Sequence, residues 1–155
     1  MSQPLNQLNP SSLTSAKIIP LTPKKILILE DDESLKPVFN TIFETIDARI
    51  LPDWVSSVED ALVRLKKEEE ASPSIPYDMI IADIFLNGEG TGIDFLKVCQ
   101  EKYPKMYVLI MSSAPLVKLL KLLGPSTACP VFLEKPIRIP ECLGIFKRIL
   151  LHSDS

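Results

Sequence analysis

The sequence predicts an α/β domain in which a parallel sheet is covered by helices on both faces. Two observations predict this. Short apolar runs alternate along the chain with stretches whose apolar residues recur at helical spacing. The short runs contain few polar residues, as strands buried on both faces do. The 155 residues suffice for one domain with one core.

Five strands are expected. In chain order, they are 26–29, 49–55, 79–83, 107–111 and 131–133. Pro52 interrupts the second of these strands, and proline is tolerated at the edge of a sheet far better than in its middle. With right-handed crossovers, an edge position for strand two favours the order 2-1-3-4-5. The predicted fold is therefore a flavodoxin-like, doubly wound (βα)5 sheet.

Five helices are expected between and after the strands. The first follows the apolar spacing of Leu35 to Ile46, with Pro37 in its first turn, where a missing N–H costs little. Ser56 and Glu59 form a candidate capping box for the second. The third is expected at about 93–102, the fourth between Pro115 and Gly124, and the last at about 140–151.

Apolar spacing also predicts the core faces of the second, fourth and last helices. For the second helix the predicted core residues are Val58, Ala61, Leu62 and Leu65. For the fourth they are Leu116, Leu119, Leu120 and Leu123, and for the last they are Cys142, Leu143, Phe146, Ile149 and Leu150.

The remaining composition sets limits on function. Residues 1–24 are rich in Pro, Ser, Asn, Gln and Thr, so we expect a disordered arm before a domain at 25–151 and a short tail at 152–155. A net charge of −3 gives no general attraction to nucleic acid or anionic membrane. No apolar run approaches the ~20 residues of a membrane span, and no signal peptide is recognised.

The cysteines and the histidine exclude several kinds of site. The three cysteines have no paired or metal-like spacing, which favours reduced thiols in a cytoplasmic protein. The single histidine, His152, lies near the C-terminus. A histidine-rich metal site and a conventional histidine-dependent triad are therefore excluded.

Polar residues stand directly at the ends of four predicted strands. Glu30 and Asp31 follow the first strand, Asp83 ends the third, Ser112 follows the fourth, and Lys135 comes soon after the fifth. Ligand chemistry in open α/β sheets gathers beyond the carboxyl ends of the strands. In the order 2-1-3-4-5 strands one and three are neighbours. The carboxylates of Glu30, Asp31 and Asp83 are therefore expected to converge.

Three carboxylates packed together repel one another, and a divalent cation would resolve that conflict. Mg²⁺ is a hard ion that prefers such oxygen ligands. Alternatively, Glu30, Asp31 and Asp32 would only cap the helix that starts near Glu33. Asp83 and Lys135 at neighbouring strand ends favour the cation site, with Asp32 expected as the cap.

Ser112 and Lys135 also have ordinary explanations. Ser112 would close a turn with Ser113, and Lys135 would be a surface lysine. In a phosphoryl site, however, the hydroxyl of Ser112 would meet a phosphoryl oxygen, and Lys135 would stabilise incoming phosphate charge. Together with the carboxylates, the two residues predict a magnesium and phosphoryl site.

These motifs, in this order over about residues 25–151, resemble the receiver domain of two-component response regulators. The resemblance implies that Glu30 and Asp31 bind Mg²⁺ and that Asp83 accepts the phosphoryl group and also binds the metal. It implies that Ser112 is the switch hydroxyl, Lys135 the characteristic lysine and Phe132 the switch aromatic residue. It further implies a metal contact from the backbone carbonyl of Phe85, and a cis Lys135-Pro136 peptide bond.

Two positions depart from the pattern of this family. Receivers usually have proline four residues after the phosphoacceptor, where this chain has Asn87. The expected glycine appears at Gly92, one residue later than usual. We therefore expect a slightly longer loop after strand three, with consequences for kinase contacts rather than for the site residues.

The function implied is a phosphorylation-dependent signalling switch. Asp83 would accept a phosphoryl group from a histidine kinase or phosphotransfer protein, and the protein would be no enzyme beyond slow self-dephosphorylation. One alternative is a phosphorylation-independent interaction module, which would be expected to lack one of the acids or the lysine. Another is a haloacid-dehalogenase-type phosphatase, which needs a second Asp where this chain has Phe85.

The output surface is expected to be the helix 116–123, strand five and the last helix. Val117 and Leu122 flank the core stripe of helix 116–123, and Ile145 lies opposite the core face of the last helix. Scattered surface aliphatic residues are common. The alternative is a docking surface for an unknown downstream protein or for a second copy of the chain.

Overall fold

The computed structural model describes residues 22–86, 91–125 and 128–152 and confirms the predicted sheet. Five parallel strands lie in the order β2-β1-β3-β4-β5. They are β1 (Ile26–Leu29), β2 (Asp53–Val55), β3 (Met79–Asp83), β4 (Tyr107–Ser112) and β5 (Phe132–Glu134). The central strands β1 and β3 are buried along their whole length, which explains why they read as continuous apolar runs.

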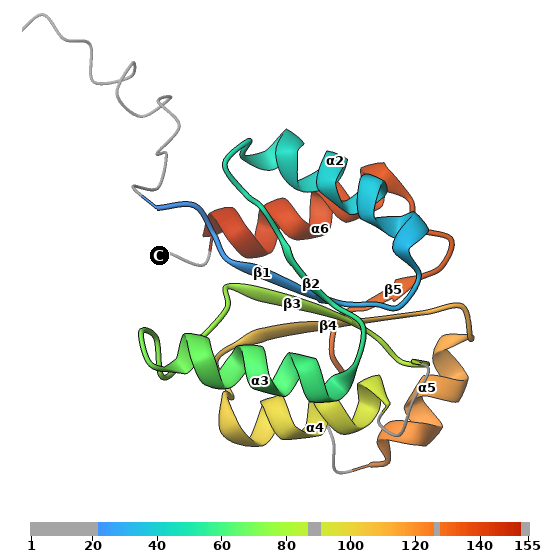
Figure 1. The fold of residues 1–155 in the computed structure, drawn as a ribbon. Helices are drawn as coiled ribbons and strands as arrows, with labels where there is room; N and C mark the ends of the chain where they lie inside the picture. The colour runs from blue at the N-terminus through green and yellow to red at the C-terminus, as the bar shows by residue number, and fades with distance from the viewer. Residues whose placement is uncertain (1–21, 87–90, 126–127, 153–155) are drawn as a thin grey trace, which may run out of the picture.

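Helices cover both faces of the sheet (Figure 1). On one face lie α2 (Lys36–Ile46), which follows the short 3-10 helix η2 (Glu33–Leu35), and α6 (Ile139–His152). On the other face lie α3 (Val58–Glu69), α4 (Gly92–Lys102) and α5 (Leu116–Leu123). Within the described residues, no helix is long and apolar enough to cross a membrane.

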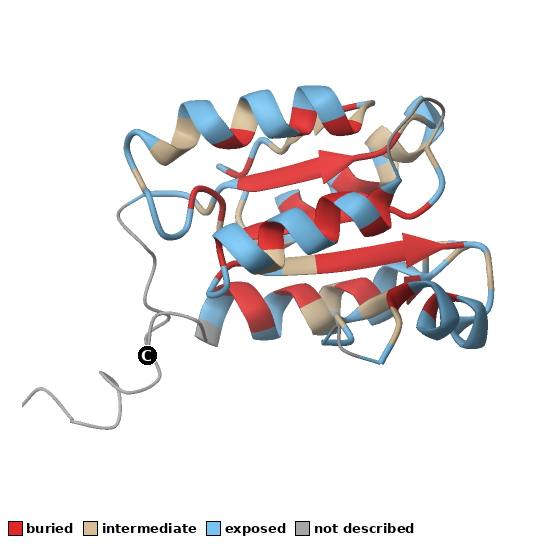
Figure 2. Cartoon of the chain, turned by 90° about the horizontal axis from the view of Figure 1, so that it is seen from below, coloured by how far each residue is buried: buried red, intermediate tan, exposed pale blue. Residues whose placement is uncertain are grey.

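The core therefore forms two layers, one on each side of the sheet. Figure 2 shows strands that are buried over most of their length and helices that are buried on one side only. In the layer under α2 and α6, the rings of Phe43 and Phe146 stack with centroids 5.1 Å apart. Both faces of the sheet are thus packed, and the carboxyl edge of the strands is left for chemistry.

Two of the three cysteines lie in these layers, as buried thiols. Burial raises the pKa of Cys99 to about 12 and that of Cys142 to about 11. The thiolate is the reactive form of cysteine, so neither side chain is suited to nucleophilic chemistry. Cys129 is exposed.

Several predicted boundaries and caps were wrong by a few residues. Strand two begins at Asp53 rather than Arg49, directly after Pro52. Strand five begins one residue later than predicted, at Phe132. The cap of α3 is Ser57, whose side chain accepts a hydrogen bond from the Asp60 N–H, rather than Ser56.

Periodicity also predicted core faces that were too wide. In α5 only Leu119 and Leu123 are buried, while Leu116 and Leu120 are exposed. In α3 Leu62 is likewise exposed. These helices contact the sheet along one narrow row of side chains, so residues at the margin of the apolar stripe reach solvent.

The last helix departs from the prediction at two positions. Ile145, expected to face solvent, is half-buried and packs against the core. Leu143 is half-buried rather than fully buried. The predicted outward apolar position of α6 is therefore partly covered, whereas Val117 and Leu122 of α5 are exposed as predicted.

Gly92 marks a close approach between α4 and the end of β3. Its N–H donates to the Ile84 carbonyl at 3.0 Å. A Cβ atom at position 92 would lie 2.0 Å from the Asp83 carbonyl oxygen. The Thr91 and Asp94 side chains cap α4 at the same point. Residues 87–90, including the predicted departure at Asn87, lie outside the described residues, as do residues 1–21 of the arm and 153–155 of the tail.

We predict that Gly92→Ala lowers the free energy of unfolding by about 1–3 kcal/mol, because the new methyl group collides with the backbone of Asp83. Gly144→Ala in α6 is the matched control, since an added Cβ there meets nothing within 4 Å. The control should raise the free energy of unfolding by about 0.5–1 kcal/mol. Urea denaturation measures both changes, and equal stability for the two variants would contradict the close approach.

Candidate functional site

The strand register brings the predicted site residues to one edge of the sheet. Leu29 of β1 pairs with Ala82 of β3, so that Glu30 emerges beside Asp83. Asp83 in turn pairs with Met111, which places Ser112 one residue further on in β4. The site is therefore a direct product of parallel strands that end in nearly the same row.

Lys135 connects the two buried acids. Its Nζ atom donates to Glu30 Oε2 at 2.8 Å and to Asp83 Oδ2 at 3.0 Å. Glu30 is 0% exposed and Asp83 is 5% exposed. The ammonium group thus neutralises charge that would otherwise be buried without a partner, a situation that strongly destabilises proteins.

Backbone groups fix the remaining oxygens of these carboxylates. The Asp32 N–H donates to Glu30 Oε1 at 2.9 Å, and the Phe85 N–H donates to Asp83 Oδ1 at 3.1 Å. The side chain of Asp32 does not join the site but caps η2 by accepting from the Ser34 N–H, as predicted. Each buried carboxylate is therefore oriented from two sides.

The pKa values of the pair reflect burial and mutual contact. Burial raises the pKa of Glu30 above its ordinary value, and the hydrogen bond from Lys135 offsets only part of this effect. Burial works in the opposite direction on Lys135, but the hydrogen bonds to Glu30 and Asp83 outweigh it and raise the pKa of the ammonium group. Lys135 consequently remains a cation at neutral pH.

Three carboxylates at this edge have the chemistry of a divalent-cation site. Glu30, Asp31 and Asp83 each offer an oxygen, and these oxygens lie within 4.8 Å of one another. An all-oxygen donor set fits Mg²⁺, which binds through a few carboxylates and keeps several waters. The predicted fourth contact, the backbone carbonyl of Phe85, remains a prediction.

Ser112 and Phe132 complete the predicted set. Ser112 is 1% exposed, and its Oγ accepts a hydrogen bond from the Ala114 N–H at 2.9 Å. The Ser112 carbonyl accepts from the Lys135 N–H at 2.8 Å, which ties the end of β4 to the residue that bridges the acids. The peptide bond between Lys135 and Pro136 is cis, as predicted. Phe132 is half-buried against the core on the α3 and α4 side, and its switch role remains a prediction.

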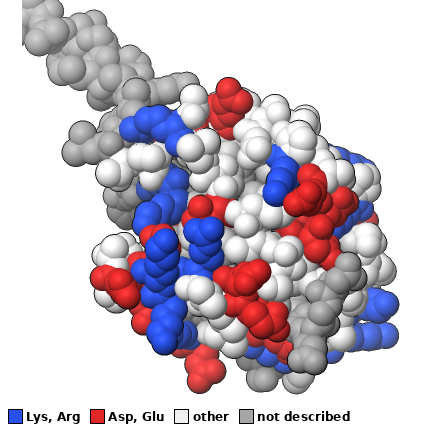
Figure 3. Space-filling model, viewed as in Figure 1, with Lys and Arg blue, Asp and Glu red and all other residues white. Residues whose placement is uncertain are grey.

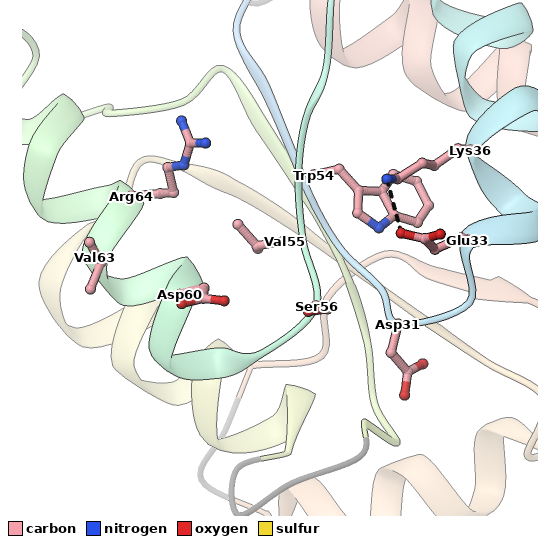
Figure 4. Close-up of a pocket in the computed structure, with 9 residues that line it drawn as sticks. All are labelled: Asp31, Glu33, Lys36, Trp54, Val55, Ser56, Asp60, Val63 and Arg64. Atoms are coloured by element: carbon pink, nitrogen blue, oxygen red, sulfur yellow. Dashed lines mark hydrogen bonds and ion pairs between the residues drawn. The ribbon is translucent and has the colours of Figure 1, made fainter.

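A hollow that the sequence did not predict adjoins the carboxylates. It has a volume of about 560 Å³ and lies between the start of α2, the end of β2 and α3 (Figure 4). Asp31 and Trp54 both line it. The apolar spacing of α2 and α3 gave no signal for this hollow, because the residues that α2 and α3 contribute to its walls lie outside their core faces.

Comparison with known proteins supports the fold. The sequence matches no protein-family model and no curated protein. Among solved structures, a response regulator from Chloroflexus aurantiacus is 21% identical with a TM-score of 0.66, over 83% of this chain and 98% of that one. A CheY-like receiver domain protein from Methanospirillum hungatei is 16% identical with a TM-score of 0.69, over 86% of this chain and 100% of that one.

The HemR receiver domain from Leptospira biflexa is also similar. It is 21% identical with a TM-score of 0.59, over 81% of this chain and 93% of that one. At this level of identity the similarity shows the fold. The chain has the fold of a response regulator receiver domain, with strand order 2-1-3-4-5.

We predict that Asp31→Asn weakens Mg²⁺ binding by roughly tenfold or more, because the metal loses one of three carboxylate oxygens. Asp32→Asn is the matched control, because that side chain caps η2 and an amide oxygen can still accept from Ser34. Titration calorimetry measures both affinities, and Trp54 fluorescence offers a second signal from the shared hollow. Equal Mg²⁺ affinities for the two variants would show that Asp31 is not a ligand of the metal.

Proposed function

We propose that this protein is a phosphorylation-dependent signalling switch in which Asp83 accepts a phosphoryl group. The observation that carries this proposal is the contact of the Lys135 ammonium with both Glu30 and Asp83 at the carboxyl edge. One Asp83 oxygen is held by Lys135 and the other by the Phe85 N–H, so the carboxylate is oriented for attack. A purely structural ion pair would not need a third carboxylate, Asp31, beside it.

The proposed donor is a phosphohistidine on a histidine kinase or phosphotransfer protein. An Asp83 oxygen forms a bond to phosphorus while the bond from phosphorus to the imidazole nitrogen breaks. The electron pair of that bond leaves with the imidazole. Lys135 stabilises the charge on the transferring group, and bound Mg²⁺, held by Glu30, Asp31 and Asp83, would supply further charge neutralisation.

The proposed signal passes from the site to the surface formed by α5, β5 and α6. The new charge on Asp83 would attract the Ser112 hydroxyl, and Phe132 would move inward from its half-buried position. Ser112 and Phe132 belong to neighbouring strands whose residues pair directly, so movement at one bears on the other. A switch of this kind requires two states that the phosphoryl group biases.

The kind of partner proposed for this protein follows from the charged and apolar side chains on its surface. On the face seen in Figure 3, basic and acidic side chains lie among one another, which is unlike the basic patch of a nucleic-acid-binding protein. On α5, by contrast, four apolar side chains are exposed: Leu116, Val117, Leu120 and Leu122. We propose that α5 contacts a downstream protein or a second copy of the chain, in the cytoplasm.

We predict that Asp83→Asn abolishes uptake of a phosphoryl group from acetyl phosphate in the presence of Mg²⁺, because the amide cannot form the acyl phosphate. The swap is nearly isosteric, so the fold should persist. Intact-mass measurement detects the added group in the wild type and in Asp32→Asn, which is the control. Uptake by Asp83→Asn at the wild-type rate would disprove the assignment. A wild type that takes up nothing would favour a phosphorylation-independent module.

We predict that beryllium fluoride with Mg²⁺ promotes a dimer and that Val117→Glu weakens it roughly tenfold, as loss of a central interface contact does. Val63→Glu on α3 is the matched control, since Val63 is 68% exposed and Val117 is 64% exposed. Light scattering measures the association. If the wild type is a monomer both with and without beryllium fluoride, a second copy of the chain is excluded as the partner of α5, and a different protein remains.

A further inference from the structure

The Lys118 ammonium lies over the ring of Phe85, the residue whose backbone N–H donates to the proposed acceptor. The Lys118 Nζ atom lies 5.7 Å from the centroid of the Phe85 ring, within the range of a cation–π interaction. Phe85 belongs to the segment after β3, whereas Lys118 lies in the first turn of α5, which follows β4. The contact therefore joins two segments that leave neighbouring strands at the same edge of the sheet.

The backbone of Phe85 is held by a hydrogen bond, whereas its ring is not enclosed by the core. Its N–H donates to Asp83 Oδ1 at 3.1 Å, so the residue begins at the acceptor itself. Its side chain is nonetheless 48% exposed, unlike the neighbouring Ile84, which is buried. An exposed aromatic ring gains little from the core, and the Lys118 ammonium is the charged group that the structure places against it.

We infer that Lys118 is a positioning residue that holds the Phe85 ring at the mouth of the acceptor site and slows hydrolysis of the acyl phosphate. This inference rests on the proposed function. In hydrolysis, a water oxygen bonds to phosphorus while the bond from phosphorus to the Asp83 oxygen breaks. The carboxylate leaves with the electron pair, and the water proton passes to solvent. A ring held beside Asp83 restricts the approach of that water.

Ala114, just after the end of β4, strengthens the inference. Ala114, two residues after Ser112, carries no group that could orient a water molecule. Its N–H is already engaged by the Ser112 Oγ. Phe85 and Ala114 are both apolar, so neither side chain can hydrogen-bond to a water molecule, and the Phe85 ring can control water only by steric exclusion.

Lys118 could instead act by placing its charge near the phosphoryl group, and a double-mutant cycle separates the two modes. The protein is loaded with acetyl phosphate and Mg²⁺, freed of donor, and followed by intact mass. The acyl phosphate of Lys118→Met should hydrolyse about two- to fivefold faster than that of the wild type. This range corresponds to the free energy of an exposed cation–π contact. Lys118→Arg should restore the wild-type lifetime, since a guanidinium also sits on aromatic faces.

The decisive comparison uses Phe85→Leu. In that background, Lys118→Met should leave the lifetime unchanged, because there is no ring to position. A persisting effect of Lys118→Met would overturn the inference in favour of direct charge. Lys121→Met, at the other exposed lysine of α5, is the matched control and should match the wild type.

Failure of the inference and failure of the proposed function give different results. If the wild type acquires no phosphoryl group, the proposed function is wrong and the inference falls with it. If loading is normal but Lys118→Met and the wild type have equal lifetimes, only the inference is overturned. Thermal unfolding of the unphosphorylated variants should be equal, which excludes a general loss of stability as the cause of faster hydrolysis.

Discussion

The arrangement depends on one constraint: two buried carboxylates, Glu30 and Asp83, share the ammonium group of Lys135. Burying either acid alone would be strongly unfavourable, and their mutual repulsion would add to the cost. Lys135 reduces both effects, and it does so across a sequence separation that only the folded sheet can close. The strand order and the common row of strand ends are therefore what allow this chain to carry three acids in one place.

The same constraint leaves the site sensitive to charge. The carboxylates outnumber the ammonium group even with Lys135 in contact, and burial raises the pKa of Glu30. A divalent cation, followed by a phosphoryl group, would change the charge balance around this cluster. Ser112 and Lys135 are joined through a backbone hydrogen bond, so a change at the acids reaches β4 and β5 together. This geometry suits a switch better than it suits a site built only for stability.

The fold and the acids were predictable from sequence for a physical reason. Strands buried on both faces are nearly pure apolar runs, so the first charged residue after each run, such as Glu30 or Asp83, marks the edge of the sheet. Pro52 indicated that strand two lies at an edge of the sheet. The resulting order 2-1-3-4-5 makes strands one and three neighbours. The pairing of Lys135 with the acids was expected from its place after strand five.

Other features depend on tertiary packing and were not predictable in the same way. Periodicity gives the direction of a helix face but not its width, which is why Leu120 was assigned to the core and is exposed. Ser56 and Ser57 are chemically equivalent as caps, and only the approach of the chain to α3 selects Ser57. The contact between Phe85 and Lys118 joins the segment after β3 to the first turn of α5, and no local pattern links residues so far apart.

The central claim is that Asp83 is the residue that carries the phosphoryl group, and chemical trapping tests it most directly. Protein incubated with acetyl phosphate and Mg²⁺ is reduced with borohydride, which converts an aspartyl phosphate into homoserine, and is then mapped by peptide mass spectrometry. The account predicts homoserine at position 83 and only there. Homoserine at Asp31 or Asp32, or at no position in protein that has gained a phosphoryl group, would contradict it.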